Sequence, residues 1–238
     1  AVPPKTQGQW RIRLWDENDQ PGAWSEADFE TGLAQSDWQG VWVCPETEAP
    51  EIDCTDAINA FAKPNWEQKQ AALEASGKGQ AQPYPPHRPA SYLRKRFTAP
   101  AGESKRLYIT AKGLYAAWLN GKRVGDMVLA PGSFTADKHL GAQTYDVTAL
   151  VREGENELLI ALGDGWYRST SGVDGDRDLF GKEVAVLFQL EVDGKAVCVS
   201  DSSMEATQCG PIRQNDLQQG EVYDARLEGE LSGWHGVK

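Results

Sequence analysis

The sequence predicts an all-β protein: a jelly-roll β-sandwich with a short helical insertion, preceded by part of another β-sandwich. Strand-like segments are short and numerous, and dipeptides that favour tight hairpins connect several of them. Glycine and proline, the residues that most often mark turns, account for 24 and 13 of the 238 residues. A chain of this length fits one large β-domain or a medium domain with a partial companion.

The first 36 residues predict two strands. Trp10, Ile12 and Leu14 alternate with polar residues, which places them on one face of a strand, and residues 29–33 indicate a second strand. Because two strands alone rarely form a stable sheet, we interpret residues 1–36 as the C-terminal strands of a truncated, fibronectin-III-like β-sandwich. The chain is therefore expected to begin inside a longer protein.

Residues 37–238 are predicted to form the jelly-roll domain, with an insertion over 46–90. The insertion is rich in Pro, Glu, Ala and Gln and contains a predicted helix over 66–76. Asn65 is a suitable N-cap for this helix, and Gln68 follows three residues later, as in a capping box. Beyond the insertion, alternation and turn residues predict strands over 93–98, 106–111, 114–119, 123–128, 157–162, 184–192 and 196–200.

Two dipeptides predict tight hairpins, Asn120-Gly121 and Asp193-Gly194. A two-residue type I′ turn needs a positive φ at both central residues, which Asn, Asp and Gly tolerate. The strand over 184–192 begins with apolar residues on both faces. Gln189 and Glu191 then alternate with apolar neighbours, so we expect this strand to end with one face in water.

Charge and hydropathy restrict the partners. The chain has 35 acidic and 24 basic residues, a formal charge of −11, and an acidic surface repels phosphate, so no nucleic-acid partner is expected. No apolar run approaches the eighteen residues or so of a membrane span, so no membrane partner is expected either. A neutral ligand fits this composition better.

The four cysteines form two local pairs, Cys44 with Cys54 and Cys198 with Cys209. Their spacing suits small disulfide loops and not a metal site of the CxxC type. Two disulfides would favour a periplasmic or secreted protein, whereas four reduced thiols in a cytosolic protein is the alternative. The first residues lack the charged start and apolar run of a signal peptide, so any such peptide was removed or lay upstream.

A set of motifs in fixed order resembles a known family. The motifs are Gly113-Leu114-Tyr115-Ala116-Ala117-Trp118-Leu119-Asn120-Gly121, Leu129-Ala130-Pro131-Gly132, Thr144-Tyr145-Asp146-Val147-Thr148, Gly154-Glu155-Asn156, Gly163-Asp164-Gly165-Trp166-Tyr167 and Gly220-Glu221-Val222-Tyr223-Asp224-Ala225-Arg226. This order resembles the N-terminal β-sandwich of bacterial α-L-rhamnosidases of the large inverting family, over roughly residues 91–234. Members of that family continue into a lectin-like sandwich and an (α/α)6 barrel, which holds the two catalytic carboxylates.

The resemblance implies a non-catalytic, carbohydrate-associated module whose partners are L-rhamnose or rhamnosides and the catalytic and lectin-like domains of its parent chain. In sugar-binding sandwiches of this kind, an acidic residue and a neighbouring amide after a Pro-Gly step hold calcium. The matching positions here are Asp137 and Lys138. Since Lys138 brings a positive charge to that place, no cofactor is expected, although a calcium site stays an alternative.

Three further residues are candidate sugar contacts. Trp166 and Tyr167 could supply a flat apolar surface for a sugar ring, with Asp164 orienting its hydroxyls. The alternative is that Trp166 is a core residue at a strand end. The acidic segment over 174–178 begins like a calcium loop, but Leu179 stands where that loop needs Gly, so a solvated loop is the better interpretation.

Two other functions fit the same fold class. One is a purely structural scaffold that packs on the catalytic barrel, and the other is a cell-surface adhesion sandwich. The three histidines have no ligand spacing, and no serine lies in a nucleophile-elbow context. The sequence therefore predicts no catalytic residue in this chain.

Overall fold

The computed structural model describes residues 2–47, 71, 75, 88–171 and 177–238. The predicted helix over 66–76 lies outside these residues except for Ala71 and Ala75, which are both helical. Within the described part of the chain, no helix has the length and apolarity that a membrane span requires.

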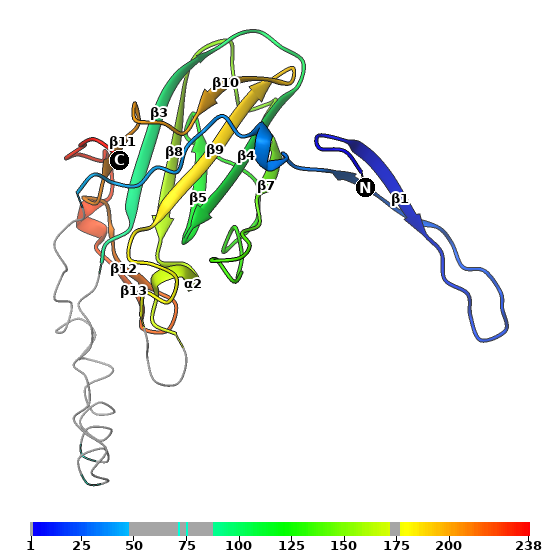
Figure 1. Ribbon diagram of the computed structural model, residues 1–238, viewed down its shortest axis with the longest axis horizontal. Helices are drawn as coiled ribbons and strands as arrows, with labels where there is room; N and C mark the ends of the chain where they lie inside the picture. The colour runs from blue at the N-terminus through cyan, green and yellow to red at the C-terminus, as the bar shows by residue number, and fades with distance from the viewer. Residues whose placement is uncertain (1, 48–70, 72–74, 76–87, 172–176) are drawn as a thin grey trace.

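Two antiparallel sheets pack face to face and form a sandwich (Figure 1). The four-stranded sheet has the order β10 (Lys195–Val199), β9 (Ala185–Val192), β4 (Lys105–Lys112) and β7 (Gln143–Asp146). The five-stranded sheet has the order β11 (Glu205–Thr207), β3 (Ser91–Ala99), β8 (Gly154–Gly163), β5 (Leu114–Leu119) and β6 (Lys122–Arg123). These sheets confirm the predicted all-β sandwich.

Four more strands and three short helical turns complete the described fold. They are β1 (Gln7–Ile12), β2 (Ser25–Glu30), β12 (Ile212–Asp216), β13 (Gly220–Tyr223), η1 (Gln35–Asp37), α2 (Gly165–Arg168) and η2 (Ala225–Leu227). The β1–β2 pair and the β12–β13 pair are separate two-stranded sheets.

The core lies between the two large sheets and follows the alternation of each strand. Every second residue of the long strands points inward, which buries a continuous apolar layer. The inward residues include Leu93, Leu107, Ile109, Tyr115, Ala117, Leu119, Leu158, Ile160, Leu162, Val186, Phe188 and Leu190. Burial of this layer is the main force that holds the sheets together.

Both predicted hairpins are present. Asn120 and Gly121 have φ values of 52° and 78°, and Asp193 and Gly194 have 49° and 76°. Each dipeptide connects directly paired strand ends, β5 with β6 and β9 with β10. The positive φ at both central residues agrees with the type I′ prediction.

The strand predicted over 123–128 is wrong beyond Arg123. Gly125 takes a φ of 63°, and a Cβ there would lie only 2.3 Å from the Tyr145 ring, so the chain turns away from the sheet at this residue. The sequence analysis also missed β7, β11, β12 and β13, which are three to five residues long. Runs this short carry little periodicity.

The prediction that β9 ends with one face in water is also wrong. Gln189 and Glu191 are buried, because the N-terminal segment covers the outer face of β9. Gln39 donates its backbone N–H to Gln189 Oε1 (2.7 Å), and Lys5 Nζ donates to Glu191 Oε1 (2.6 Å). Burial here depends on residues about 150 or more positions away, which local alternation does not reveal.

The β1–β2 hairpin projects from the body of the sandwich (Figure 1). Trp10, Ile12 and Leu14 on this hairpin are exposed. A second ion pair, Arg106 Nε to Glu30 Oε2 (3.0 Å), joins the hairpin to the four-stranded sheet. That residues 1–36 belong to a larger sandwich stays a prediction.

The structure does not contain the predicted disulfide between Cys198 and Cys209. Both are free thiols: Cys198 points from β10 into the core, whereas Cys209 is exposed after β11. The two residues are associated with different sheets, since β10 is in the four-stranded sheet and β11, which Cys209 follows, is in the five-stranded one. The pairing of Cys44 with Cys54 is not tested, because Cys54 lies outside the described residues.

Candidate functional site

Segments far apart in the sequence meet at one end of the sandwich. The loop over 131–141, helix α2 and the loop over 177–183 enclose a small hollow next to β4 and β5. Its lining residues are Ala111, Gly113, Pro131, Gly132, Phe134, Ala136, Leu140, Trp166, Tyr167 and Phe180. We call this region the loop end.

Trp166 and Tyr167 lie on α2 and are half-buried. The Tyr167 ring packs against Phe180 with 6.3 Å between ring centroids, and Phe180 donates its backbone N–H to the Tyr167 carbonyl (3.1 Å). The hollow beside them has a volume of about 10 Å³, enough for about one water molecule. A sugar at this end would therefore contact the rim and not the interior of the hollow.

The turn into α2 depends on Gly165. This residue has a φ of 55°, and a Cβ there would lie 2.6 Å from Leu114 Cγ. Only glycine combines this conformation with such close packing. The Gly-Asp-Gly step therefore fixes where the aromatic residues leave the sheet.

Asp164 is not a free sugar contact, which corrects the sequence-based assignment. Its side chain is 2% exposed and accepts a 2.6 Å hydrogen bond from Arg168 Nε, whose side chain is fully buried. Burial raises the pKa of the Asp164 carboxyl, and the charges of Arg168 and nearby arginines oppose that shift. Arg168 also donates from Nη1 to the Lys182 carbonyl (3.0 Å), so it ties α2 to the loop over 177–183.

Asp137 and Lys138 are both exposed on the loop over 131–141. Lys138 Nζ lies 3.3 Å from Asp137 Oδ2, and the backbone N–H groups of Lys138 and His139 both donate to the Thr135 carbonyl. The ammonium group thus occupies the position next to the carboxylate that a cation would need. Among the described residues, no group of three potential metal ligands includes Asp137.

Part of the acidic segment over 174–178 can be placed. Asp178 forms a 2.7 Å ion pair with Arg88 Nη1, and both side chains are mostly buried. Asp174 and Asp176 lie outside the described residues, so the calcium-loop interpretation is not tested.

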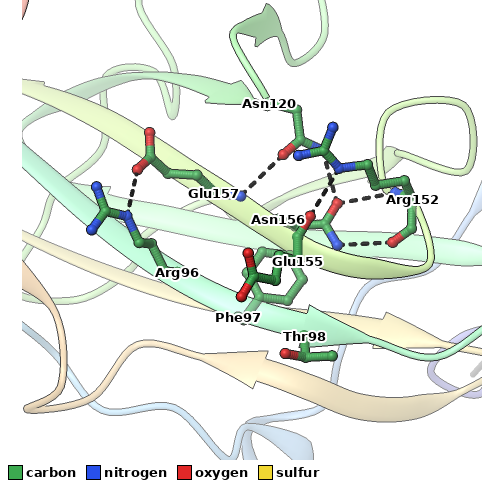
Figure 2. Close-up of a pocket in the computed structure, with 8 residues that line it drawn as sticks. All are labelled: Arg96, Phe97, Thr98, Asn120, Arg152, Glu155, Asn156 and Glu157. Carbon is green, nitrogen blue, oxygen red and sulfur yellow. Dashed lines mark hydrogen bonds and ion pairs between the residues drawn. The ribbon is translucent and has the colours of Figure 1, made fainter.

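The Asn-Gly and Gly-Glu-Asn motifs meet in a structural network (Figure 2). Asn120 Nδ2 donates to Asn156 Oδ1 (2.8 Å) and to the Leu150 carbonyl (2.9 Å). Asn156 Nδ2 donates to the carbonyls of Arg152 and Gly154 (both 2.8 Å). All the amide atoms of the two asparagines are engaged, so the adjoining hollow of about 370 Å³ has no free amide for a ligand.

These features can be compared with known proteins. The family model described as "Alpha-L-rhamnosidase N-terminal domain" matches residues 101–238, more than half of the chain. The chain belongs to the α-L-rhamnosidase N-terminal domain family. A second family model, "Rha78A-like, N-terminal immunoglobulin domain", matches residues 1–35 of this chain.

Known relatives resemble nearly the whole rhamnosidase domain. An α-L-rhamnosidase of Formosa agariphila is 34% identical over 227 residues, which are 92% of this chain and 22% of that protein. The native α-L-rhamnosidase structure from Aspergillus terreus has a TM-score of 0.72 and 30% identity, and the match covers 99% of this chain and 26% of that one. The Streptomyces avermitilis α-L-rhamnosidase complexed with L-rhamnose has a TM-score of 0.71 and 24% identity, covering 100% of this chain and 37% of that one. This chain thus spans between 22% and 37% of these proteins.

Of the five predicted sugar contacts, Trp166 and Tyr167 line the hollow of the loop end, and Asp137 and Lys138 are exposed on the loop over 131–141. The sequence analysis missed Arg168, although its position four residues after Asp164 is a signal for an ion pair on a helical turn.

Proposed function

We propose that this rhamnosidase domain is a non-catalytic module that binds rhamnosides at the loop end. Its partners are L-rhamnose or rhamnosides and the catalytic and lectin-like domains of a longer parent chain. One observation supports this proposal most directly: the loop over 131–141 and α2 pack together, so that the exposed Asp137 and Lys138 lie on the same loop that encloses Trp166 and Tyr167.

The residues of the loop end suit a neutral, partly apolar sugar. The Asp137 carboxylate can accept hydrogen bonds from hydroxyl groups, and Lys138 can donate to a hydroxyl or ring oxygen. The accessible parts of Trp166 and Tyr167 offer apolar contact for the methyl group of a 6-deoxy sugar.

We assign the hydrolysis to the parent's (α/α)6 barrel. An inverting glycosidase needs two carboxyl groups about 6.5–9.5 Å apart, one able to donate a proton and one able to activate water. At the loop end, Asp164 is locked to Arg168 and Asp178 to Arg88. The exposed carboxylates of the loop end are Asp137, which lies beside Lys138, and Glu183, which forms an ion pair with Lys238. Each therefore faces a basic group, which does not match the separate acid and base of such a pair.

Calorimetric titration of the 238-residue chain with L-rhamnose tests the proposal. We expect saturable binding that Asp137→Ala weakens by about tenfold or more, since a hydrogen-bonding charge is lost. Glu103→Ala, which removes an exposed carboxylate from another loop, should leave the affinity unchanged. Turnover of an aryl α-L-rhamnoside at an enzyme-like rate would overturn the non-catalytic assignment.

A structural scaffold is the second candidate, and the closed hollow favours it. If Trp166 serves only to pack the loop end, Trp166→Ala will lower the free energy of unfolding without changing any sugar affinity. The adhesion sandwich has no observation in its favour beyond the fold. A periplasmic or secreted location stays part of the proposal and depends on the Cys44–Cys54 pairing.

A further inference from the structure

A second region has the features of a ligand site: a groove on the outer face of the five-stranded sheet. Its volume is about 350 Å³, within the range of about 300–1,000 Å³ typical of small-molecule sites. The sheet forms the floor, and β13 with the segment that follows it forms the wall. The residues that matter here are Tyr92, Trp118, Leu159, Glu157, Tyr223 and Glu228.

The floor of the groove is apolar on a face that usually carries polar residues. Trp118 and Leu159 are direct cross-strand partners on β5 and β8, and both are only half-buried. Tyr92 lies on the neighbouring strand β3 and packs in the same outer cluster. In an antiparallel sandwich the outer face is normally solvated, so a half-exposed aromatic surface here is a candidate contact for a ligand. The Arg123 guanidinium lies 5.2 Å from the Trp118 ring centroid and borders this surface.

The rim of the groove carries side chains that can form further hydrogen bonds. Glu157 Oε2 accepts from Arg96 Nε (3.0 Å; Figure 2), and Glu228 Oε1 accepts from the Tyr223 hydroxyl (2.9 Å). Within the described part of the chain, the second oxygen of each carboxylate and the Trp118 indole N–H have no hydrogen-bond partner. The rim therefore offers two acceptors and one donor around an aromatic floor.

We infer that this groove binds a neutral pyranose, with the sugar ring against Trp118 and its hydroxyls on Glu157 and Glu228. The apolar C–H face of a pyranose suits an aromatic floor, and carboxylate oxygens accept from adjacent hydroxyls. Glu157 pairs with Arg96, whereas Glu228 accepts from the neutral Tyr223 hydroxyl and keeps its negative charge, which disfavours an anionic group beside it. The choice of a rhamnoside as the ligand rests on the proposed function. The groove itself is a different site from the loop end.

Indole N–H signals in ¹H–¹⁵N NMR spectra test the inference. The probe is methyl α-L-rhamnoside, and Trp118→Phe, Trp166→Phe and Trp24→Phe assign the three indole signals. We expect a saturable shift of the Trp118 signal and none of the Trp24 signal, because Trp24 lies on the N-terminal sequence before β2. Sodium D-glucuronate at the same concentrations should leave the Trp118 signal in place.

Variants separate this inference from the proposed function. Glu228→Ala, at an exposed position, should weaken the affinity reported by Trp118 by about tenfold and leave any shift of Trp166 unchanged. A shift of Trp166 alone would overturn the groove and support the loop end. A shift of Trp118 alone would support the groove and overturn the loop end. If neither the Trp118 signal nor the Trp166 signal shifts, both binding sites are overturned. That result would favour a groove that packs against another segment of the parent chain and does not bind sugar.

Discussion

Arg168 illustrates how one buried side chain can organise a loop region. Its guanidinium group is fully buried, pairs with Asp164 on the preceding turn and reaches the Lys182 carbonyl. Both groups lose their water on folding, so neither is tolerated in the interior without the other. At the residue scale, this side chain ties α2 to the loop over 177–183.

Arg168→Ala should therefore destabilise the domain strongly. Removing one partner of a buried pair leaves an uncompensated charge and costs about 3–5 kcal/mol. Urea unfolding followed by circular dichroism measures this as a lower midpoint. The control is Arg226→Ala, which removes an exposed partner of Asp224 and should not move the midpoint measurably. Equal midpoints for the two variants would contradict the role of Arg168.

The free cysteines should differ sharply in reactivity. Burial raises the pKa of the Cys198 thiol to about 12, so at pH 8 it stays protonated and shielded. Cys209 is exposed. We expect N-ethylmaleimide to label Cys209 and to spare Cys198 until urea unfolds the protein, as peptide mass spectrometry can show. A peptide that joins the two cysteines under non-reducing conditions would contradict the structure, and the same map reports whether Cys44 pairs with Cys54.

At the scale of elements, the Asn120–Asn156 network locks the β5–β6 hairpin to the start of β8. Asn156→Ala should lower the free energy of unfolding by at least about 2 kcal/mol, because each buried polar group left unpaired costs about 1–3 kcal/mol. Glu155→Ala, at the exposed neighbouring position, should change it little. Thermal and urea unfolding provide the measurement, and a similar effect of both substitutions would refute the network's importance.

The sequence predicted the turns and strands that are determined by residues close to one another in the chain. The Asn-Gly and Asp-Gly turns and the alternation of the long strands depend on neighbouring residues, and the structure agrees with them. Elements that depend on distant residues were missed. Glu191 is buried because Lys5 reaches it, and Asp164 is unavailable to a ligand because Arg168 fills the space beside it. The aromatic residue types suggested Trp166 and Tyr167 as a binding surface. The outer groove was not predicted, because its lining residues come from four strands that are distant in the sequence, β3, β5, β8 and β13.

At the scale of the whole molecule, two ion pairs join the N-terminal hairpin to the sandwich. Lys5 binds the buried Glu191, and Glu30 binds Arg106, whose second nitrogen lies 3.0 Å from Asp146. Both pairs lie on the outer face of the four-stranded sheet. The base of the hairpin and the linker that follows it therefore lie against part of that face, whereas the opposite outer face carries the groove.

We expect the double variant Lys5→Ala with Glu30→Gln to release the hairpin while the sandwich stays folded. Without Lys5, Glu191 keeps only the Gln189 Nε2 hydrogen bond (2.8 Å), and without the Glu30 charge Arg106 still has Asp146. Hydrogen exchange followed by mass spectrometry should show faster exchange in peptides covering 31–43, where Gln39 and Val41 bond to the sandwich. Arg11→Ala is the matched control, because Arg11 and Glu26 form an exposed pair at 3.9 Å within the hairpin itself. Unchanged protection of 31–43 in the double variant would show that backbone bonds and packing hold the hairpin, and that the ion pairs contribute nothing measurable.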